Sequence, residues 1–199
     1  MTTVLAIDQG TSGTKAVVVD GAGLVRGLAE VPLRPEYRPG GVVEQDPHQL
    51  LDSVRVAARQ AVAAAGVPVD GITLANQGES VLAWDPATGR PLSAVVVWQD
   101  SRAESVCTPL ADHAAMVAER TGLVLDPYFT APKLAWLRRN VTTEGVVSTS
   151  DAWILHELAG EYVTDASTAG RSLVTSLDTG RYDAELLDLF DLGDELLPR

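Results

Sequence analysis

The apolar residues near the N-terminus form short runs that predict β-strands. Val4 to Ile7 is a continuous apolar run between polar residues, which is typical of a strand buried on both faces. A second β-rich run extends from Lys15 to Asp20, and a third from Leu24 to Val31, each after a short turn. Because strands joined by short turns pair with their neighbours, we expect a three-stranded antiparallel meander.

A helical spacing of apolar residues follows a proline-rich segment. Residues 32–47 contain four prolines and the Gly40-Gly41 pair, which predicts a loop. Asp46-Pro47 is a favourable helix start, and apolar residues then recur at intervals of three and four until Gly66. The next strand is expected from Gly71 to Asn76. Because a helix connects it to the meander, it should pair in parallel, which predicts the α/β class.

The rest of the pattern mixes short strands and helices. Ser80 to Trp84 and Leu92 to Trp98 predict a hairpin around a turn at residues 85–89. The capping-box pattern from Ser101 to Glu104 predicts the start of a helix that runs toward Arg120. Further expected elements are a helix at 132–139, a strand at 146–147 and helices at 151–158 and 183–190.

Composition and charge narrow the range of partners. The chain has 199 residues, 46% of them hydrophobic, and 15 basic against 27 acidic residues give a net charge of −12. Nucleic acid and anionic membranes attract basic proteins, so we expect neither as a partner. The longest clean apolar run, Ala94 to Trp98, is far shorter than the roughly 20 residues of a membrane span. Cys107 is the only cysteine, which fits a cytoplasmic location.

The strongest chemical signal is the segment Asp8-Gln9-Gly10-Thr11-Ser12-Gly13-Thr14-Lys15 between two β-runs. Its glycines let backbone N–H groups approach a phosphate, and its hydroxyls add donors. A carboxylate at the end of a strand is a ligand for Mg²⁺. The alternative is a plain glycine-rich hairpin turn with a surface lysine. A Walker A loop and a dinucleotide fingerprint are both excluded, because the glycine spacing differs and no helix follows.

A phosphate loop of the strand–turn–strand type resembles that of the actin-like ATPase superfamily. Five blocks along the chain are then similar, in order, to the N-terminal domain of the FGGY carbohydrate kinases, the group that contains glycerol and xylulose kinases. The blocks are residues 8–15, 41–47, 76–79, 97–102 and 126–133, with a looser sixth at 163–167 and Arg171. The resemblance implies a ribonuclease H-like (actin-like ATPase) fold of the α/β class, with a mixed sheet flanked by helices. It implies that residues 1–199 form the sugar-binding N-terminal domain.

The resemblance also assigns roles on the phosphate side. It implies that ATP and Mg²⁺ are the cofactors. Asp8 would lie near Mg²⁺, and Thr11, Ser12 and Lys15 would face the transferred phosphate. Lys15 would supply local positive charge in a strongly acidic chain.

On the acceptor side, the resemblance implies a sugar pocket lined by Gln77, Glu79, Trp98 and Tyr128. The chemistry agrees, because a carboxylate accepts hydrogen bonds from vicinal hydroxyls and an indole forms an apolar wall. Each residue also has a structural alternative: Trp98 as a core aromatic at the end of a strand, Tyr128 as a packing residue in a proline-flanked loop, and Glu79 as a turn carboxylate.

Two departures from the family pattern bear on function. Glycerol kinases carry Arg between the Gln and Glu of the third block, and here the residue is Gly78, which puts glycerol itself in doubt as the acceptor. Family members are also about twice as long. Their second domain, absent from this chain, is expected to supply the catalytic Asp base and the adenosine site. We therefore expect these 199 residues alone to be nearly inactive.

The resemblance predicts an ATP-dependent kinase that phosphorylates a hydroxyl of a small sugar or polyol. Its partners would be that substrate, ATP and the missing C-terminal domain. A non-catalytic sugar-binding or regulatory module derived from such a kinase is the main alternative, and another type of actin-like ATPase is a third. The sequence leaves the oligomeric state open, a homodimer included.

Overall fold

The computed structural model describes residues 2–199, which divide into two compact units. The first unit contains the described residues up to Pro35 together with Gln45–Gln77. The second contains Glu36–Glu44 and Gly78–Arg199. Among the residues described, no helix has both the length and the apolar character needed to cross a membrane.

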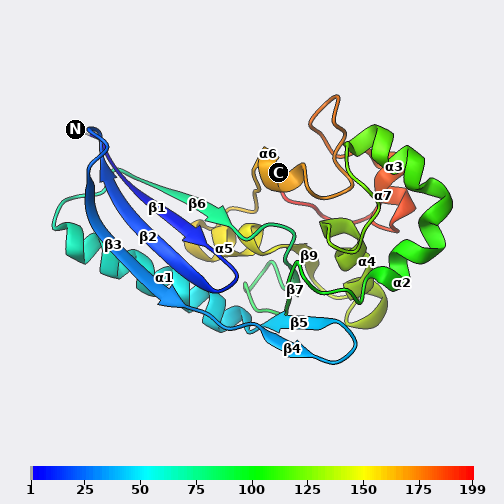
Figure 1. Cartoon of the computed structure of the whole chain (residues 1–199), viewed down its shortest axis with the longest axis horizontal. Coiled ribbons are helices and arrows are strands. Elements are labelled where there is room, and N and C mark those ends of the chain that lie inside the picture. The colour runs from blue at the N-terminus through cyan, green and yellow to red at the C-terminus, as the bar shows by residue number, and fades with distance from the viewer. Residues whose placement is uncertain (1) are drawn as a thin grey trace. The chain divides into compact units, whose positions relative to one another are not determined.

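The first unit is a four-stranded sheet covered on one face by a helix (Figure 1). Its strands run in the order β3-β2-β1-β6, and their bounds are Thr3–Gln9 (β1), Gly13–Asp20 (β2), Val25–Pro32 (β3) and Gly71–Asn76 (β6). Strand β2 pairs antiparallel with both β1 and β3, whereas β6 pairs in parallel with β1. The predicted meander and the parallel fourth strand are therefore confirmed.

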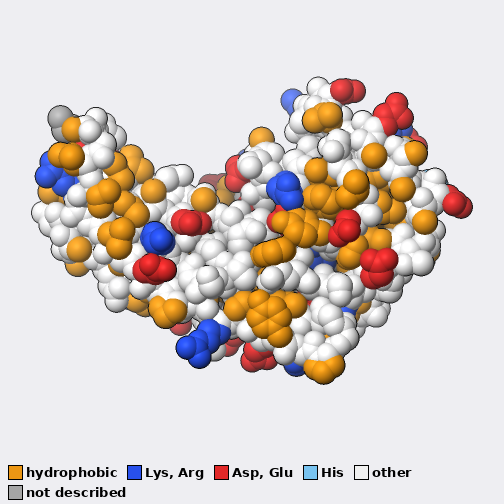
Figure 2. Space-filling view, in the orientation of Figure 1, with side chains coloured by type: hydrophobic (Ala, Val, Ile, Leu, Met, Phe, Trp, Pro, Cys, Tyr) orange, Lys and Arg blue, Asp and Glu red, His pale blue; other side chains and the backbone are white. Residues whose placement is uncertain are grey.

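Burial in β1 differs from the prediction. The strand was expected to be buried on both faces, but its burial alternates: Leu5 and Ile7 are buried, Val4 and Ala6 are partly exposed, and Asp8 is exposed. The reason is that helix α1 packs on only one face of the sheet. Figure 2 shows apolar side chains gathered over the strands of this unit on the face that is visible there.

Helix α1, Pro47–Ala65, starts and ends where the sequence predicts. The Asp46 side chain accepts a hydrogen bond of 2.8 Å from the His48 N–H, and Gly66 ends the helix in the left-handed conformation. Leu50, Val54, Ala57 and Ala61 are fully buried and form the stripe that faces the sheet. The approach to β3 is so close that a Cβ at Gly27 would lie 2.2 Å from the Ala61 carbonyl oxygen.

The second unit contains a five-stranded sheet in the order β4-β5-β8-β7-β9, except that the last residue of β5, Gln45, is counted with the first unit. The strand bounds are Glu36–Arg38 (β4), Val42–Gln45 (β5), Val81–Trp84 (β7), Val95–Val96 (β8) and Val146–Thr149 (β9). The prediction of a loop through residues 32–47 is therefore wrong in part. Prolines at 35 and 39 flank β4, which tolerates them because it is a short edge strand.

The predicted hairpin is present but shorter than expected. Strand β7 pairs with β8 through Val81 and Val96, and a single bridge joins Trp84 to Pro91. Between them, the Ala83 N–H donates to the Ser93 hydroxyl at 2.9 Å, so a side chain replaces a strand bond there.

The helix predicted from Ser101 to Arg120 is broken into three pieces, and its capping box is wrong. These are α2 (Glu104–Cys107), a 3₁₀ helix η1 (Thr108–His113) and α3 (Ala114–Thr121). The residue before α2 is Ala103, and no side chain caps this helix. Pro109 lacks a backbone N–H and so cannot continue an α-helix. Gly122 ends the segment in the left-handed conformation, as expected.

Four further helices belong to the second unit. They are α4 (Thr130–Asn140), α5 (Ser150–Ala159), α6 (Ala166–Ala169) and α7 (Ala184–Leu189), of which only α6 was not predicted. The core forms around α4, whose Ala131, Leu134 and Leu137 are buried with Phe129 and Phe190.

Candidate functional site

In the first unit, the turn between β1 and β2 carries the predicted phosphate-binding residues. The Gly10 N–H donates to the Gly13 carbonyl at 2.9 Å and closes the turn. Ser12 is exposed and Thr11 is partly exposed, so both residues lie at the surface of this unit. A Cβ at Gly13 would lie 3.0 Å from the Val31 carbonyl oxygen, which explains a glycine there.

Three glutamine side chains form a hydrogen-bonded cluster that contacts this turn. The Gln77 side chain accepts a hydrogen bond from the Thr11 hydroxyl at 3.2 Å and donates to Gln45 at 3.0 Å and to Gln9 at 3.4 Å. The Gln45 amide in turn donates to the Thr11 carbonyl at 2.7 Å. Gln9 and Gln45 are almost fully buried. Gln77 was predicted to bind the sugar or polyol. In the structure its side chain hydrogen-bonds to Thr11 in the phosphate-binding turn and to the two other glutamines.

Asp8 and Lys15 are direct neighbours across the β1–β2 pair. Both are exposed on the face opposite to α1, and Lys15 also forms an ion pair of 3.9 Å with Glu30 on β3. No group of three His, Cys, Asp or Glu residues suited to a metal occurs among residues 2–199. A single exposed carboxylate still fits Mg²⁺, because this ion is usually held by one or two carboxylates together with phosphate oxygens and water.

In the second unit, Glu79 is buried and paired with a cation. Its side chain is 3% exposed and its carboxylate accepts a short hydrogen bond from Nε of Arg171. The backbone of Glu79 has φ = 40°, in the left-handed region that non-glycine residues rarely adopt. The hydrogen bond to Glu79 is the main reason that the pKa of Arg171 is raised.

Trp98 and Tyr128 pack against each other beside this ion pair. Their ring centroids are 5.2 Å apart, and the Arg171 guanidinium carbon lies 5.5 Å from the centre of the Tyr128 ring. The buried Ser80 hydroxyl accepts a hydrogen bond of 3.1 Å from the Trp98 N–H and so fixes its backbone. The structure thus brings together three of the four predicted acceptor-binding residues, and the fourth, Gln77, belongs to the first unit.

Lys133, which the sequence reasoning missed, organises the loop that carries Tyr128. Its side chain is fully buried, and Nζ donates to the carbonyl oxygens of Pro127 at 2.9 Å, of Tyr128 and of Phe129 at 2.6 Å. Burial lowers the pKa of Lys133 to about 7, although nearby carboxylates, with Glu79 first, act in the opposite direction. The sequence signal for this buried lysine is its position among apolar residues in a predicted helix.

Asp100 and Arg102, both in a family block, have a structural role. The buried Asp100 carboxylate accepts the Val43 N–H at 2.8 Å and pairs with Arg102 at 2.7 Å. Arg102 also bonds to Glu44 at 2.7 Å and lies 4.2 Å above the Trp136 ring. This network ties β5 to the segment that follows Trp98.

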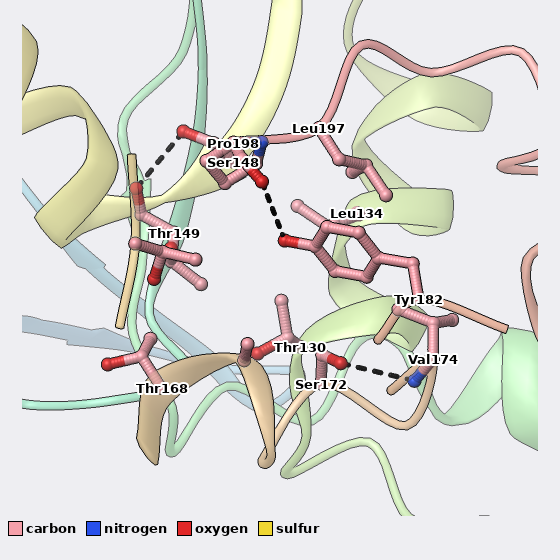
Figure 3. A pocket seen from close by; sticks show the side chains of 12 residues that line it. Thr130, Leu134, Ser148, Thr149, Thr168, Ser172, Val174, Tyr182, Leu197 and Pro198 are labelled. Carbon is pink, nitrogen blue, oxygen red and sulfur yellow. Dashed lines mark hydrogen bonds between the residues drawn. The ribbon is translucent and has the colours of Figure 1, made fainter. Parts of the chain in front are cut away.

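A separate cavity in the second unit is lined mainly by hydroxyl and apolar side chains (Figure 3). Its volume of about 20 Å³ accommodates one water molecule but not a sugar. The Tyr182 hydroxyl donates to the Pro198 carbonyl at 3.1 Å, and Ser172 accepts from the Val174 N–H at 3.2 Å. None of the predicted site residues lines this cavity.

Solved structures establish the class of fold. A Plasmodium falciparum glycerol kinase with ADP superposes with a TM-score of 0.90 at 25% identity, over 97% of this chain and 41% of that one. A xyloylose kinase from Brucella ovis gives a TM-score of 0.89 at 30% identity, over 99% of this chain and 42% of that one. The chain therefore has the actin-like ATPase fold.

Sequence comparison identifies the family. Residues 3–199 match the N-terminal domain of the FGGY family of carbohydrate kinases. Glycerol kinases from Alkalilimnicola ehrlichii and Leptothrix cholodnii are 41% and 39% identical over this whole chain. The chain belongs to the FGGY family, and it spans 43% of the length of these two relatives.

Proposed function

We propose that the protein transfers the γ-phosphoryl group of ATP to a hydroxyl of a small sugar or polyol. The observation that carries this proposal is the convergence of Glu79, Trp98 and Tyr128 in a chain of the FGGY family. A carboxylate beside two aromatic rings suits a polyhydroxylated molecule, because the carboxylate accepts hydrogen bonds from hydroxyl groups and the rings cover the carbon chain.

On the phosphate side, Thr11, Ser12 and Lys15 would bind the terminal phosphate of the nucleotide together with the backbone N–H groups of the turn. Lys15 supplies positive charge in a chain whose net charge is −12. Asp8 would hold Mg²⁺, which, when bound, neutralises charge that develops on the transferred phosphate. The glutamine cluster keeps the turn in place, because Gln77 bonds to the side chain of Thr11 and Gln45 bonds to its backbone carbonyl.

On the acceptor side, Glu79 would accept hydrogen bonds from substrate hydroxyls. Trp98 and Tyr128 would form the apolar wall, and Lys133 would hold the loop of Tyr128 in position. Gln77 is also proposed to contact the substrate, because it belongs to the block of residues 76–79 that resembles the FGGY family. Phosphoryl transfer depends mainly on positioning and electrostatics, which these residues are suited to provide.

We expect the 199-residue chain alone to be nearly inactive, because a general base and the adenosine site would come from the part of the relatives that it does not match. A general base contributes roughly 10²- to 10⁴-fold to a rate. ATP dependence and the single cysteine favour a cytoplasmic location.

The test is a release assay for ADP with the protein expressed from its complete open reading frame. Glycerol, erythritol, xylulose and ribulose are offered separately with ATP and Mg²⁺. The proposal predicts ADP release that depends on at least one of these acceptors and is lost when EDTA removes the metal. Binding of an acceptor without any turnover would instead support a non-catalytic sugar-binding module.

A further inference from the structure

Backbone strain is concentrated on the two segments that form the Glu79–Arg171 ion pair. Only Glu79, Leu173 and Asp191 are non-glycine residues with positive φ among those described. Glu79 has φ = 40° and Leu173, two residues after Arg171, has φ = 66°. Such conformations cost about 1–3 kcal/mol each and persist where surrounding structure enforces them, often at ligand sites. Both segments are thus held in unfavourable conformations that bring this pair together.

The surroundings of Arg171 also fix its backbone. Its carbonyl and that of Ser172 accept hydrogen bonds from the N–H groups of Thr130 at 3.5 Å and Ala131 at 2.9 Å, at the start of α4. The guanidinium lies 5.5 Å from the Tyr128 ring centre and 5.3 Å from that of Phe129. The arginine is therefore anchored between the carboxylate of Glu79 and the aromatic side chains of the loop before α4.

The guanidinium keeps donors available for a ligand. A guanidinium has five N–H donors, of which the bond to Glu79 uses the one at Nε and a hydrogen bond to the Tyr128 side chain uses another. The Arg171 side chain is 43% exposed, whereas that of Glu79 is 3% exposed. Gly78, the residue before Glu79, has no side chain that could pair with this carboxylate, and a Cβ there would have no atom within 4 Å. The cation that accompanies this carboxylate therefore comes from position 171, 92 residues away in sequence.

We infer that Arg171 is a specificity-determining residue that donates hydrogen bonds to one hydroxyl of a neutral vicinal diol while Glu79 accepts from the adjacent hydroxyl. The inference rests on the proposed function, because it concerns the acceptor of that reaction. The ion pair has no net charge, so it suits an uncharged polyol better than a sugar acid.

Binding measurements test this inference separately from turnover. Isothermal titration of the full-length protein uses the acceptor that binds best in the polyol panel, its analogue without one vicinal hydroxyl, and the corresponding aldonic acid. The wild type is expected to bind the polyol about 10- to 100-fold more tightly than the deoxy analogue. Arg171→Gln should lose most of this discrimination, and Arg171→Lys should recover part of it. Arg181→Gln, a change at an exposed arginine outside the pair, is the matched control and should behave as the wild type.

An equal loss of affinity for polyol and deoxy analogue in Arg171→Gln would overturn the inference, because it would indicate general damage to the site. Tighter binding of the aldonic acid than of the polyol by the wild type would also overturn it. The thermal midpoint of each variant separates unfolding from loss of contact. Absence of ADP release in the wild type, with polyol discrimination intact, would refute only the proposed kinase activity.

Discussion

Replacing Lys133 with methionine removes the buried ammonium group while keeping a side chain of similar length. The three carbonyl oxygens of residues 127–129 then lose their donor, and as backbone groups they cannot be removed by mutation. The Phe129 acceptor is buried and those of Pro127 and Tyr128 are partly buried, so each one left without a donor costs at most about 1–3 kcal/mol. The relief of burying a cation offsets part of this, so we expect a net loss of about 2–4 kcal/mol. That is a large part of the roughly 5–15 kcal/mol stability of an ordinary domain.

The same change should remove a pH dependence. The pKa of Lys133 is lowered from 10.5 to about 7 in the folded chain, mainly by burial. Between these values the unfolded chain binds a proton that the folded chain has released, so stability rises with pH. From pH 7 to pH 9 this amounts to about 2 kcal/mol. Above pH 9 the effect is opposed, because burial raises the pKa of Cys107 to about 12.

Urea unfolding at pH 7, 8 and 9 measures both effects. The stability difference between wild type and Lys133→Met should widen by about 2 kcal/mol over this range. The chain has only two lysines, so the ¹³Cε signal of Lys133 can be followed directly, with Lys15→Met used to assign it. A difference that stays constant with pH, or a lysine signal that does not titrate near pH 7, would refute the reasoning.

Three further changes test the fold and the site. Asp46→Ala should cost about 1 kcal/mol in urea unfolding because α1 loses its N-cap, whereas Asp46→Asn should cost little; equal stability of all three proteins would contradict the capping role. Gly27→Ala should cost about 1–3 kcal/mol, since its Cβ would meet the Ala61 carbonyl at 2.2 Å, while Gly71→Ala, with open space around it, serves as the control. Trp98→Ala should raise KM for the acceptor about tenfold or more through loss of the apolar wall, and Trp98→Phe should raise it less; an unchanged KM in initial-rate measurements would make Trp98 a packing residue.

The parts of the fold that the sequence predicts well are those determined by local patterns. Strands β1 to β3, helix α1 and strand β6 follow from apolar spacing, the cap at Asp46 and the stop at Gly66. The loop predicted for residues 32–47 contains two strands, because β4 pairs with the adjacent β5 in spite of the prolines, and β5 is held in turn by β8, which is distant in sequence. The helix predicted from the capping-box pattern at Ser101 is broken because Pro109 lies inside the predicted range and has no backbone N–H to continue an α-helix.

The residues of the candidate site also fall into two groups: those that short sequence segments reveal and those that depend on tertiary contacts. The motif at residues 8–15 and the blocks around Glu79, Trp98 and Tyr128 are visible in the sequence as short contiguous segments. The partner of Glu79 is not, because Arg171 reaches it across 92 residues through the packing of α4. The buried positions of Gln9, Gln45 and Lys133 also depend on tertiary contacts, and a polar residue type alone predicts exposure.

The central claim is that one turn binds the nucleotide phosphate and that a separate cluster of Glu79, Trp98 and Tyr128 binds the polyol. Titration of two variants with two ligands tests this claim most directly. The full-length protein, Asp8→Asn and Glu79→Gln are each titrated with the Mg²⁺ complex of a non-hydrolysable ATP analogue and with the best polyol. The account predicts that Asp8→Asn weakens only the nucleotide complex and that Glu79→Gln weakens only the polyol. Unchanged affinities in both variants, or loss of the same ligand in both, would contradict it.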